Sequence, residues 1–129
     1  EWSSILFNFY TNSKKAIYRK EGKGIIGIEC GVSEKMIYLE FSDNGIGIPE
    51  EYEERIFDEF FTTTSAMNYE DIDSVNAVLG TGLGLKIVKD IVESYKGRIS
   101  VTSRKNQFNT CIRVEIPMLD DKDFEKYGL

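Results

Sequence analysis

The chain has 129 residues, of which 41% are hydrophobic and 29% are charged, and its formal net charge is -6. This length and balance predict one soluble globular domain with a hydrophobic core. The net charge argues against nonspecific nucleic-acid binding, although a local basic patch is compatible with it. The absence of histidine excludes any mechanism that needs a histidine base, nucleophile or ligand within the chain.

Two further features indicate an intracellular protein. No apolar run approaches the roughly 20 residues that span a bilayer, and the N-terminus lacks the pattern of a signal peptide. The two cysteines, Cys30 and Cys111, each lie in a strand-like run and match no metal-binding spacing. We therefore expect both to be small buried side chains.

The first predicted element is an amphipathic helix over residues 1 to about 19. Its apolar stripe comprises Trp2, Ile5, Leu6, Phe9, Ala16 and Ile17. Asn8, Asn12 and Lys15 fall in one narrow arc at the edge of this stripe, so they are expected to border a cleft. Two interpretations stay open for the asparagines: ordinary solvated amides, or oxygen ligands for Mg²⁺ with Lys15 beside a phosphate.

A β-hairpin is predicted next, from strands at 25–32 and 36–42 joined by a short turn. Apolar and polar residues alternate in the second strand, and Asp43 continues the parity of the apolar ones. The sequence thus predicts a carboxylate on the inner face of the sheet, with no basic residue close by in the chain. A buried carboxylate needs hydrogen-bond donors, and a ligand with an exocyclic amine would supply one.

The segment after Asp43 leaves the sheet through Gly45, Ile46, Gly47 and Ile48 to a proline. The glycines permit close approach of the backbone to a flat ligand, while the two isoleucines offer apolar contact with its faces. This arrangement suits a purine. Taken alone, however, an Asp-Asn-Gly-x-Gly sequence is more typical of a solvated turn.

The middle of the chain contains a phenylalanine-rich segment at 55–61, predicted as a short helix packed on the core. Residues 62–79 show no periodicity, which predicts a lid or a disordered segment. A glycine-rich turn at 80–85 then begins a helix, and such a turn presents backbone N–H groups to phosphate oxygens. The apolar face of this helix is predicted to carry Ile87, Val88, Ile91, Val92 and Tyr95, and Gly97 ends it.

Two strands close the domain, at 98–104 and 110–117. Thr110 shares the parity of the apolar residues of its strand, so its hydroxyl is expected to face inward. We expect residues 1–117 to form the domain and residues 118–129 to be a peripheral acidic tail.

These motifs, in this order, resemble the catalytic ATP-binding domain of two-component sensor histidine kinases, within the superfamily that includes gyrase, Hsp90 and MutL. The resemblance covers residues 1 to about 117. It implies an α+β fold, a two-layer α/β sandwich known as the Bergerat ATP-binding fold. Its mixed, mostly antiparallel sheet of about five strands carries about three helices on one face.

The resemblance also implies roles for individual residues, with ATP and Mg²⁺ as cofactors. Asn12 would hold Mg²⁺, Asn8 would assist it, and Lys15 would approach the phosphates. Asp43 would accept a hydrogen bond from the adenine amine, with Thr110 supporting it through water. The remaining nucleotide contacts implied are Gly45, Ile46, Gly47 and Ile48 around the base, Phe60, and Gly80, Thr81, Gly82, Leu83, Gly84 and Leu85 over the phosphates.

One position favours the kinase branch of the superfamily. Its ATP-hydrolysing members resemble one another in placing a glutamate, the general base, four residues before the metal-binding asparagine. Here that position is Asn8, whose amide cannot take up a proton near neutral pH. The implied activity is therefore transfer of the γ-phosphoryl group to a histidine on a separate dimerisation and phosphoacceptor domain of the same kinase, with a response regulator as the indirect partner.

Three positions depart from the family pattern: Glu59 for a proline, Asn109 for a glycine and Ile112 for a phenylalanine. Because they lie near the lid, a non-catalytic nucleotide-binding signalling module is an alternative, as is a serine kinase of the anti-sigma-factor type. The chain looks like an excised fragment and is predicted to be monomeric, with no nucleic acid bound and no membrane insertion of its own. The expected location is the cytoplasm, either free or as the cytoplasmic part of a membrane-anchored sensor.

Overall fold

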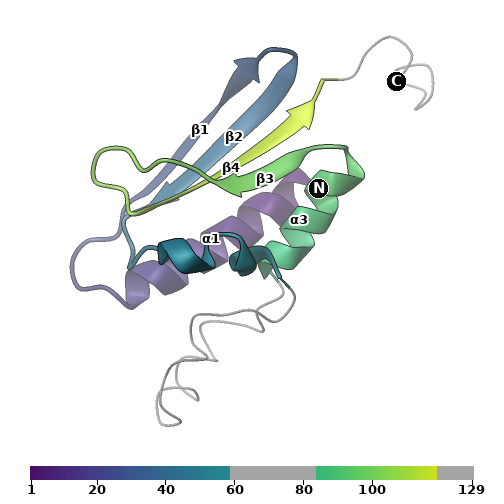
Figure 1. Ribbon diagram of the computed structural model, residues 1–129. Coiled ribbons are helices and arrows are strands. Elements are labelled where there is room, and N and C mark those ends of the chain that lie inside the picture. The colour runs from purple at the N-terminus through teal and green to yellow at the C-terminus, as the bar shows by residue number, and fades with distance from the viewer. Residues whose placement is uncertain (59–83, 119–129) are drawn as a thin grey trace.

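The computed structural model describes residues 1–58 and 84–118 (Figure 1). Two α-helices, two 3-10 helices and four strands lie in these ranges. In chain order they are α1 (Trp2–Tyr18), β1 (Ile26–Ser33), β2 (Met36–Asp43), η1 (Glu50–Tyr52), η2 (Arg55–Phe57), α3 (Gly84–Ser94), β3 (Arg98–Val101) and β4 (Thr110–Pro117). The predicted α+β class is confirmed.

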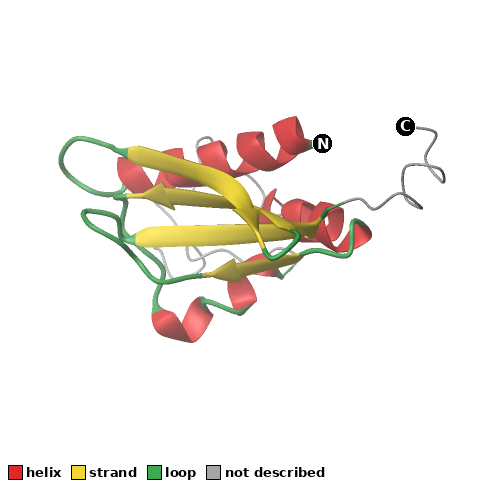
Figure 2. Cartoon of the chain, turned by 90° about the horizontal axis from the view of Figure 1, so that it is seen from above, coloured by secondary structure: helices red, strands yellow, loops and turns green. Residues whose placement is uncertain are grey.

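The four strands form one sheet in the order β1-β2-β4-β3, and every neighbouring pair is antiparallel. The described part of the chain thus shows four antiparallel strands where a mixed sheet of about five was expected. The helices lie on one side of this sheet, which gives the two layers of the predicted sandwich (Figure 2). Because β2 and β4 are the two central strands and are antiparallel, the last residue of β2 lies beside the first residue of β4.

The turn between β1 and β2 consists of Glu34 and Lys35, since Ser33 pairs with Met36. Both turn residues have positive φ, 49° and 64°, as in the tight turns that match the twist of a hairpin. Asn and Gly adopt this conformation with little strain, whereas Glu and Lys do not. The turn residues themselves disfavour this conformation, so the pairing of β1 with β2 is what stabilises the hairpin.

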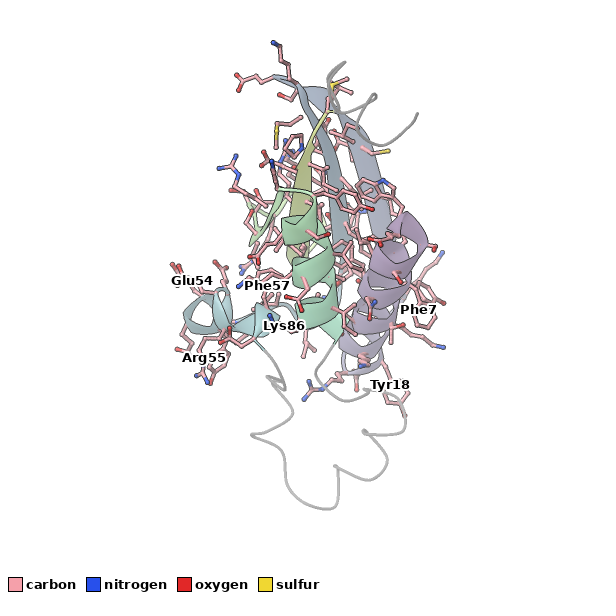
Figure 3. The ribbon with its side chains drawn as sticks, turned by 90° about the vertical axis from the view of Figure 1, so that its right-hand side faces the viewer. Phe7, Tyr18, Glu54, Arg55, Phe57 and Lys86 are labelled. Carbon is pink, nitrogen blue, oxygen red and sulfur yellow. The ribbon has the colours of Figure 1, made fainter. Side chains whose placement is uncertain are left out.

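The core lies between the sheet and the helices. Its fully buried members are Ile5 and Phe9 from α1, Val88 and Val92 from α3, and Val114 from β4. The spacing of four within each helix places each pair on one face, which explains why these segments are helices. The described part of the phenylalanine-rich segment adds Ile56 and Phe57 from η2 to this core, and Figure 3 shows Phe57 between η2 and α3.

Several side chains predicted to be buried are exposed. Ile87 of α3 and Tyr95 directly after it are 44% and 49% exposed, because they lie at the edges of the apolar stripe whose centre is Val88 and Val92. Cys30 is exposed because it lies on the outermost strand, β1, whereas Cys111 is buried as expected. The strand expected over 98–104 is shorter, and ends at Val101.

The end of α3 also differs in detail from the prediction. The left-handed residue is Lys96, with φ 61°, and Gly97 follows it. The N–H of Gly97 donates to the Val92 carbonyl and that of Lys96 to the Glu93 carbonyl, both at 2.9 Å, which is a Schellman motif. Gly97 is needed for space, since a Cβ there would collide with the Glu115 carbonyl oxygen.

The predicted acidic tail lies outside the described residues except for Met118, whose N–H donates to the Lys35 carbonyl at 2.9 Å. Within the described ranges, no helix has the length and apolar character that crossing a membrane requires.

Candidate functional site

The floor of the candidate site is formed by Asp43 and Thr110. They are direct register partners, at the end of β2 and the start of β4. Both are buried, at 4% and 6% exposure, as their parity with the apolar residues predicted. The inward carboxylate and the inward hydroxyl thus lie side by side at one end of the two central strands.

Ser13 is a residue of this floor that the sequence reasoning missed. Its Oγ donates to Asp43 Oδ2 at 2.8 Å, and the side chain is 3% exposed. The spacing of residues along α1 indicates that Ser13 is buried, because Ser13 follows Ile5 and Phe9 in steps of four. A hydroxyl on the buried face of an otherwise apolar stripe needs a partner, and Asp43 is that partner.

A second donor reaches Asp43 from its own loop, where the Gly45 N–H donates to Oδ1 at 2.9 Å. Each carboxylate oxygen therefore accepts one hydrogen bond from the described part of the chain. Burial raises the pKa of Asp43 above its ordinary value, and the hydrogen bonds from Ser13 and Gly45 oppose this rise. A carboxylate oxygen can accept more than one hydrogen bond, so Asp43 retains capacity for a ligand donor.

The loop after Asp43 is held against α1. A Cβ on Gly45 would stand 2.6 Å from the Ala16 carbonyl carbon, and the Ile46 N–H donates to the Ala16 carbonyl oxygen at 3.1 Å. The Ile46 side chain is 46% exposed, whereas Ile48 packs partly against the core. Glycine is therefore required at position 45 by the close approach of α1, in addition to the ligand contact that the resemblance implies.

Asn109, one of the three residues that depart from the family pattern, fixes the other side of this loop. Its Nδ2 donates to the Gly45 carbonyl at 2.9 Å and to the Asn44 carbonyl at 3.3 Å, and its N–H donates to the Asp43 carbonyl at 2.8 Å. Gly47 has φ +80° and lies against Asn109, whose carbonyl oxygen would be 3.3 Å from a Cβ there. The β3–β4 connection therefore clamps the loop.

Asn44 attaches the same loop to the segment before β1. Its Oδ1 accepts from the Ile25 N–H at 2.8 Å and its Nδ2 donates to the Lys23 carbonyl at 2.7 Å. Lys20 Nζ donates to the Asn44 carbonyl at 3.1 Å. The conformation of the loop is thus set by three different parts of the chain, rather than being that of a free solvated turn.

The polar edge of α1 faces the start of α3. A Cβ on Gly84 would stand 2.9 Å from Asn8 Oδ1 and 3.7 Å from Asn12 Nδ2, so the two motifs meet. Asn8 Nδ2 donates to the Ser4 carbonyl at 2.8 Å, which orients the Asn8 oxygen toward this junction. The Asn12 Nδ2 is buried and has no hydrogen-bond partner.

An unpaired buried amide costs about 1–3 kcal/mol, so the Asn12 amide fits a site that a ligand completes. Rotation of the amide by 180° would present its oxygen, the type of ligand that Mg²⁺ prefers. The side chains therefore fit the implied cation. No cluster of three or more acidic, Cys or His side chains suited to a metal occurs in the described ranges, so substrate oxygens and water would have to complete its coordination.

Lys15 lies on the same edge of α1 and is half-buried. Burial lowers the pKa of its ammonium group below the ordinary value. Within residues 1–58 and 84–118 no ion pair involves Lys15, so an anionic ligand would be its first charged partner there. Of the glycine-rich turn, Gly84 and Leu85 are described, and Leu85 packs partly against the core.

Several implied contacts lie outside the described residues: Phe60, Gly80, Thr81, Gly82 and Leu83. The described ones form two groups. Asp43, Thr110 and Ser13 make a buried polar floor with an acceptor for an amine, and Asn8, Asn12 and Gly84 make a junction between the two helices. Each group joins α1 to a different part of the fold, so α1 connects them.

Comparison with known proteins identifies the family of the chain. Residues 2–120 match the family described as "Histidine kinase-, DNA gyrase B-, and HSP90-like ATPase". The chain is 36% identical over 110 residues to the signal transduction histidine-protein kinase ArlS of Staphylococcus haemolyticus, covering 85% of this chain and 22% of that protein. It is 30% identical over 122 residues to the sensor histidine kinase WalK of Bacillus subtilis, covering 94% of this chain and 18% of WalK.

Solved structures agree. The catalytic domain of the histidine kinase ThkA aligns with a TM-score of 0.61 and 31% identity, over 88% of this chain and 63% of that one. The mycobacterial sensor histidine kinase MprB aligns with a TM-score of 0.66 over 88% of this chain and 68% of that one, and at 24% identity it supports the fold alone. This chain belongs to the family of histidine kinase-, DNA gyrase B- and HSP90-like ATPases, and corresponds to the ATP-binding domain of sensor histidine kinases.

Proposed function

We propose that this domain binds Mg·ATP and donates the γ-phosphoryl group to a histidine on a separate helical domain of the same kinase. The observation that supports this proposal is that Gly84 lies against Asn8 and Asn12 of α1, the helix that also contacts the floor made by Asp43 and Thr110. One end of this arrangement offers an acceptor for a purine amine. The other offers amide oxygens, a lysine and a helix start, which suit a cation and phosphates.

The residues of the chain have distinct tasks in this proposal. Asp43 accepts from the amine and so selects and orients the base. Lys15 and the first N–H groups of α3 neutralise and hold phosphate oxygens. A Mg²⁺ ion held at Asn12 would supply charge neutralisation between the phosphates when bound. Positioning and neutralisation are the main contributions that phosphoryl transfer requires of a protein.

The amide at Asn8 favours transfer over hydrolysis. It has no basic site near neutral pH, and its Nδ2 is already committed to the Ser4 carbonyl. It therefore does not remove a proton from water, and a water molecule at this position stays a poor nucleophile. An imidazole from a partner domain needs no such base, because its neutral nitrogen is already a nucleophile.

Binding is tested first by titrating Mg·ATP into the chain by calorimetry, with Asp43→Asn as the variant. The amide presents both a donor and an acceptor where the carboxylate presents acceptors only, so we expect binding weaker by about 1–3 kcal/mol. Glu40→Gln is the matched control. Glu40 is a second buried carboxylate of β2, on the opposite face, where it pairs with Arg113 at 2.7 Å. Equal binding by parent and Asp43→Asn would refute the assignment of the base pocket.

Transfer is tested by mixing the chain and radiolabelled ATP with the dimerisation and phosphoacceptor domain of the same kinase. Acid-labile label on that domain, lost when its histidine is replaced, is the expected result. Acid-stable label on serine would support the serine-kinase alternative instead. Tight nucleotide binding with no label on any acceptor would support a non-catalytic signalling module.

A further inference from the structure

Ser13 makes the one side-chain hydrogen bond to Asp43 that the described residues provide. We infer that Ser13 is a positioning residue that holds the Asp43 carboxylate in the orientation and charge state needed to select a purine with an exocyclic amine. This inference rests on the proposed nucleotide site and assigns to it a determinant of base selectivity on α1. No role in ligand recognition follows for Ser13 from the sequence motifs, which end at Asn12 and resume at Lys15.

The first step is geometric. Ser13 Oγ donates to Oδ2 at 2.8 Å, and the Gly45 N–H donates to Oδ1 at 2.9 Å. The two donors reach different oxygens from different elements, so together they fix the plane of the carboxylate. Loss of the Ser13 hydroxyl would leave one donor, about which the carboxylate can rotate, and the direction of the remaining acceptor sites would no longer be set.

The second step concerns charge. Asp43 is buried among α1, β1 and β4, and its register partners are Ile26 and Thr110, neither of which is charged. On α1 the facing polar group is Ser13, and no ion pair with Asp43 occurs among the described residues. The pKa of Asp43 is thus governed by burial, which raises it, and by the two hydrogen bonds, which lower it. Removing the Ser13 hydroxyl would take away one of the two hydrogen bonds that lower this pKa, so the pKa of Asp43 would rise.

The third step concerns the ligand. The 6-amino group of adenine is a donor, whereas the 6-oxo group of guanine is an acceptor. An ionised carboxylate is an acceptor only, so in a fixed orientation it pairs with the amine and repels the oxo group. A protonated carboxyl can donate to the oxo group, and a rotated carboxylate no longer directs an acceptor at the amine, so either change weakens this discrimination. The hydroxyl of Ser13 therefore contributes to selectivity without touching the base.

The test uses Ser13→Ala, with Ser13→Thr as the variant that keeps the hydroxyl. Affinities for Mg·ATP and for the Mg complex of purine riboside triphosphate, which lacks the amine, are measured by calorimetry. We expect Ser13→Ala to bind ATP about tenfold more weakly, as for loss of a hydrogen bond to a charged group, and the analogue almost as well as the parent does. Ser13→Thr restores the preference for ATP. Equal losses for both ligands, or no loss, would overturn the inference.

A second measurement does not depend on nucleotide binding. The Asp43 carboxyl is titrated by carbon-13 NMR in the nucleotide-free parent, Ser13→Ala and Ser13→Thr, with far-ultraviolet circular dichroism confirming that each is folded. We expect the pKa of Asp43 to rise in Ser13→Ala and to return toward the parent value in Ser13→Thr. An unchanged pKa would overturn the inference even where ATP binds. A parent that binds no nucleotide would instead refute the proposed function, and with it the selectivity role.

Discussion

Gly84, the first residue of α3, faces Asn8 of α1 so closely that a Cβ there would stand 2.9 Å from the Asn8 Oδ1. This contact joins the glycine-rich turn to the polar edge of α1. Alanine is the better helix former, so glycine at the start of α3 keeps space for the Asn8 amide at a cost in helix propensity.

Gly84→Ala tests that relationship. The added methyl group would meet the end of a flexible side chain, so we expect it to displace the Asn8 amide and leave the fold intact. The prediction is an ATP affinity about tenfold weaker, for the loss of roughly one polar contact, with an unfolding temperature equal to or above that of the parent. Calorimetry and thermal circular dichroism measure the two quantities. Parent-like affinity would show that Asn8 does not contribute to binding.

Asn109→Ala is predicted to loosen the loop that follows Asp43. The substitution removes the Nδ2 donor from the Gly45 and Asn44 carbonyls. We expect the free energy of unfolding to fall by about 1–2 kcal/mol, the usual range for a part-buried side-chain hydrogen bond. Urea denaturation measures this change. Gln107→Ala is the control, because Gln107 is exposed in the same connection, is not among the residues of positive φ and makes no described hydrogen bond to the loop.

Asp43→Asn is predicted to stabilise the fold at neutral pH while it weakens ATP binding. The folded protein raises the Asp43 pKa above its ordinary value of 3.8, chiefly by burial, so it retains the proton at a pH where the unfolded chain has released it. The free energy of unfolding therefore falls as pH rises from 3.8 through the raised value, and the deficit persists at neutral pH. Asparagine does not ionise, so the free energy of unfolding of the variant is not lowered in this way as pH rises.

The measurement is a series of thermal unfolding curves for parent and Asp43→Asn, from about pH 3 to about pH 8. The advantage of the variant should grow with pH across the titration of Asp43 and then become constant. An advantage that is the same at every pH would mean that the ionisation of Asp43 does not contribute to stability.

The hairpin turn offers a change remote from the site. Glu34→Asn together with Lys35→Gly places favoured residues at two positions of positive φ, and keeps the backbone hydrogen bond from Met118 to the carbonyl of residue 35. We expect a gain of about 1 kcal/mol in the free energy of unfolding. Urea denaturation checks the gain, and ATP affinity should be unchanged. A loss of stability would show that the strands do not impose this turn type.

The sequence predicts most of what this fold requires, because periodicity reports burial directly. The helix at the N-terminus, the hairpin and the strand with Thr110 all lie where the pattern places them. Asp43 and Thr110 were each predicted to face inward, but that they are register partners depends on the order of the strands in the sheet, which no local pattern contains.

The features that the sequence did not predict are long-range contacts of small polar residues. Ser13 shares the spacing of Ile5 and Phe9, but its importance depends on a partner from another element, which that spacing does not identify. Asn109 was noticed only as a departure from the family pattern, and the structure gives it two hydrogen bonds to the loop. Ile87 and Tyr95 were predicted to be buried but are exposed, because periodicity does not define how wide the buried stripe of a helix is.

The central position of β4 has a consequence for how the domain assembles. The strand that comes last along the described chain supplies Thr110 to the floor and separates β2 from β3, so the hairpin of β1 and β2 cannot complete a core by itself. Contacts this distant in sequence require a large loop to close before they form, which slows folding. During synthesis the proposed nucleotide pocket is therefore among the last parts to form, and a chain that stops before β4 leaves a hairpin with an apolar face and no partner.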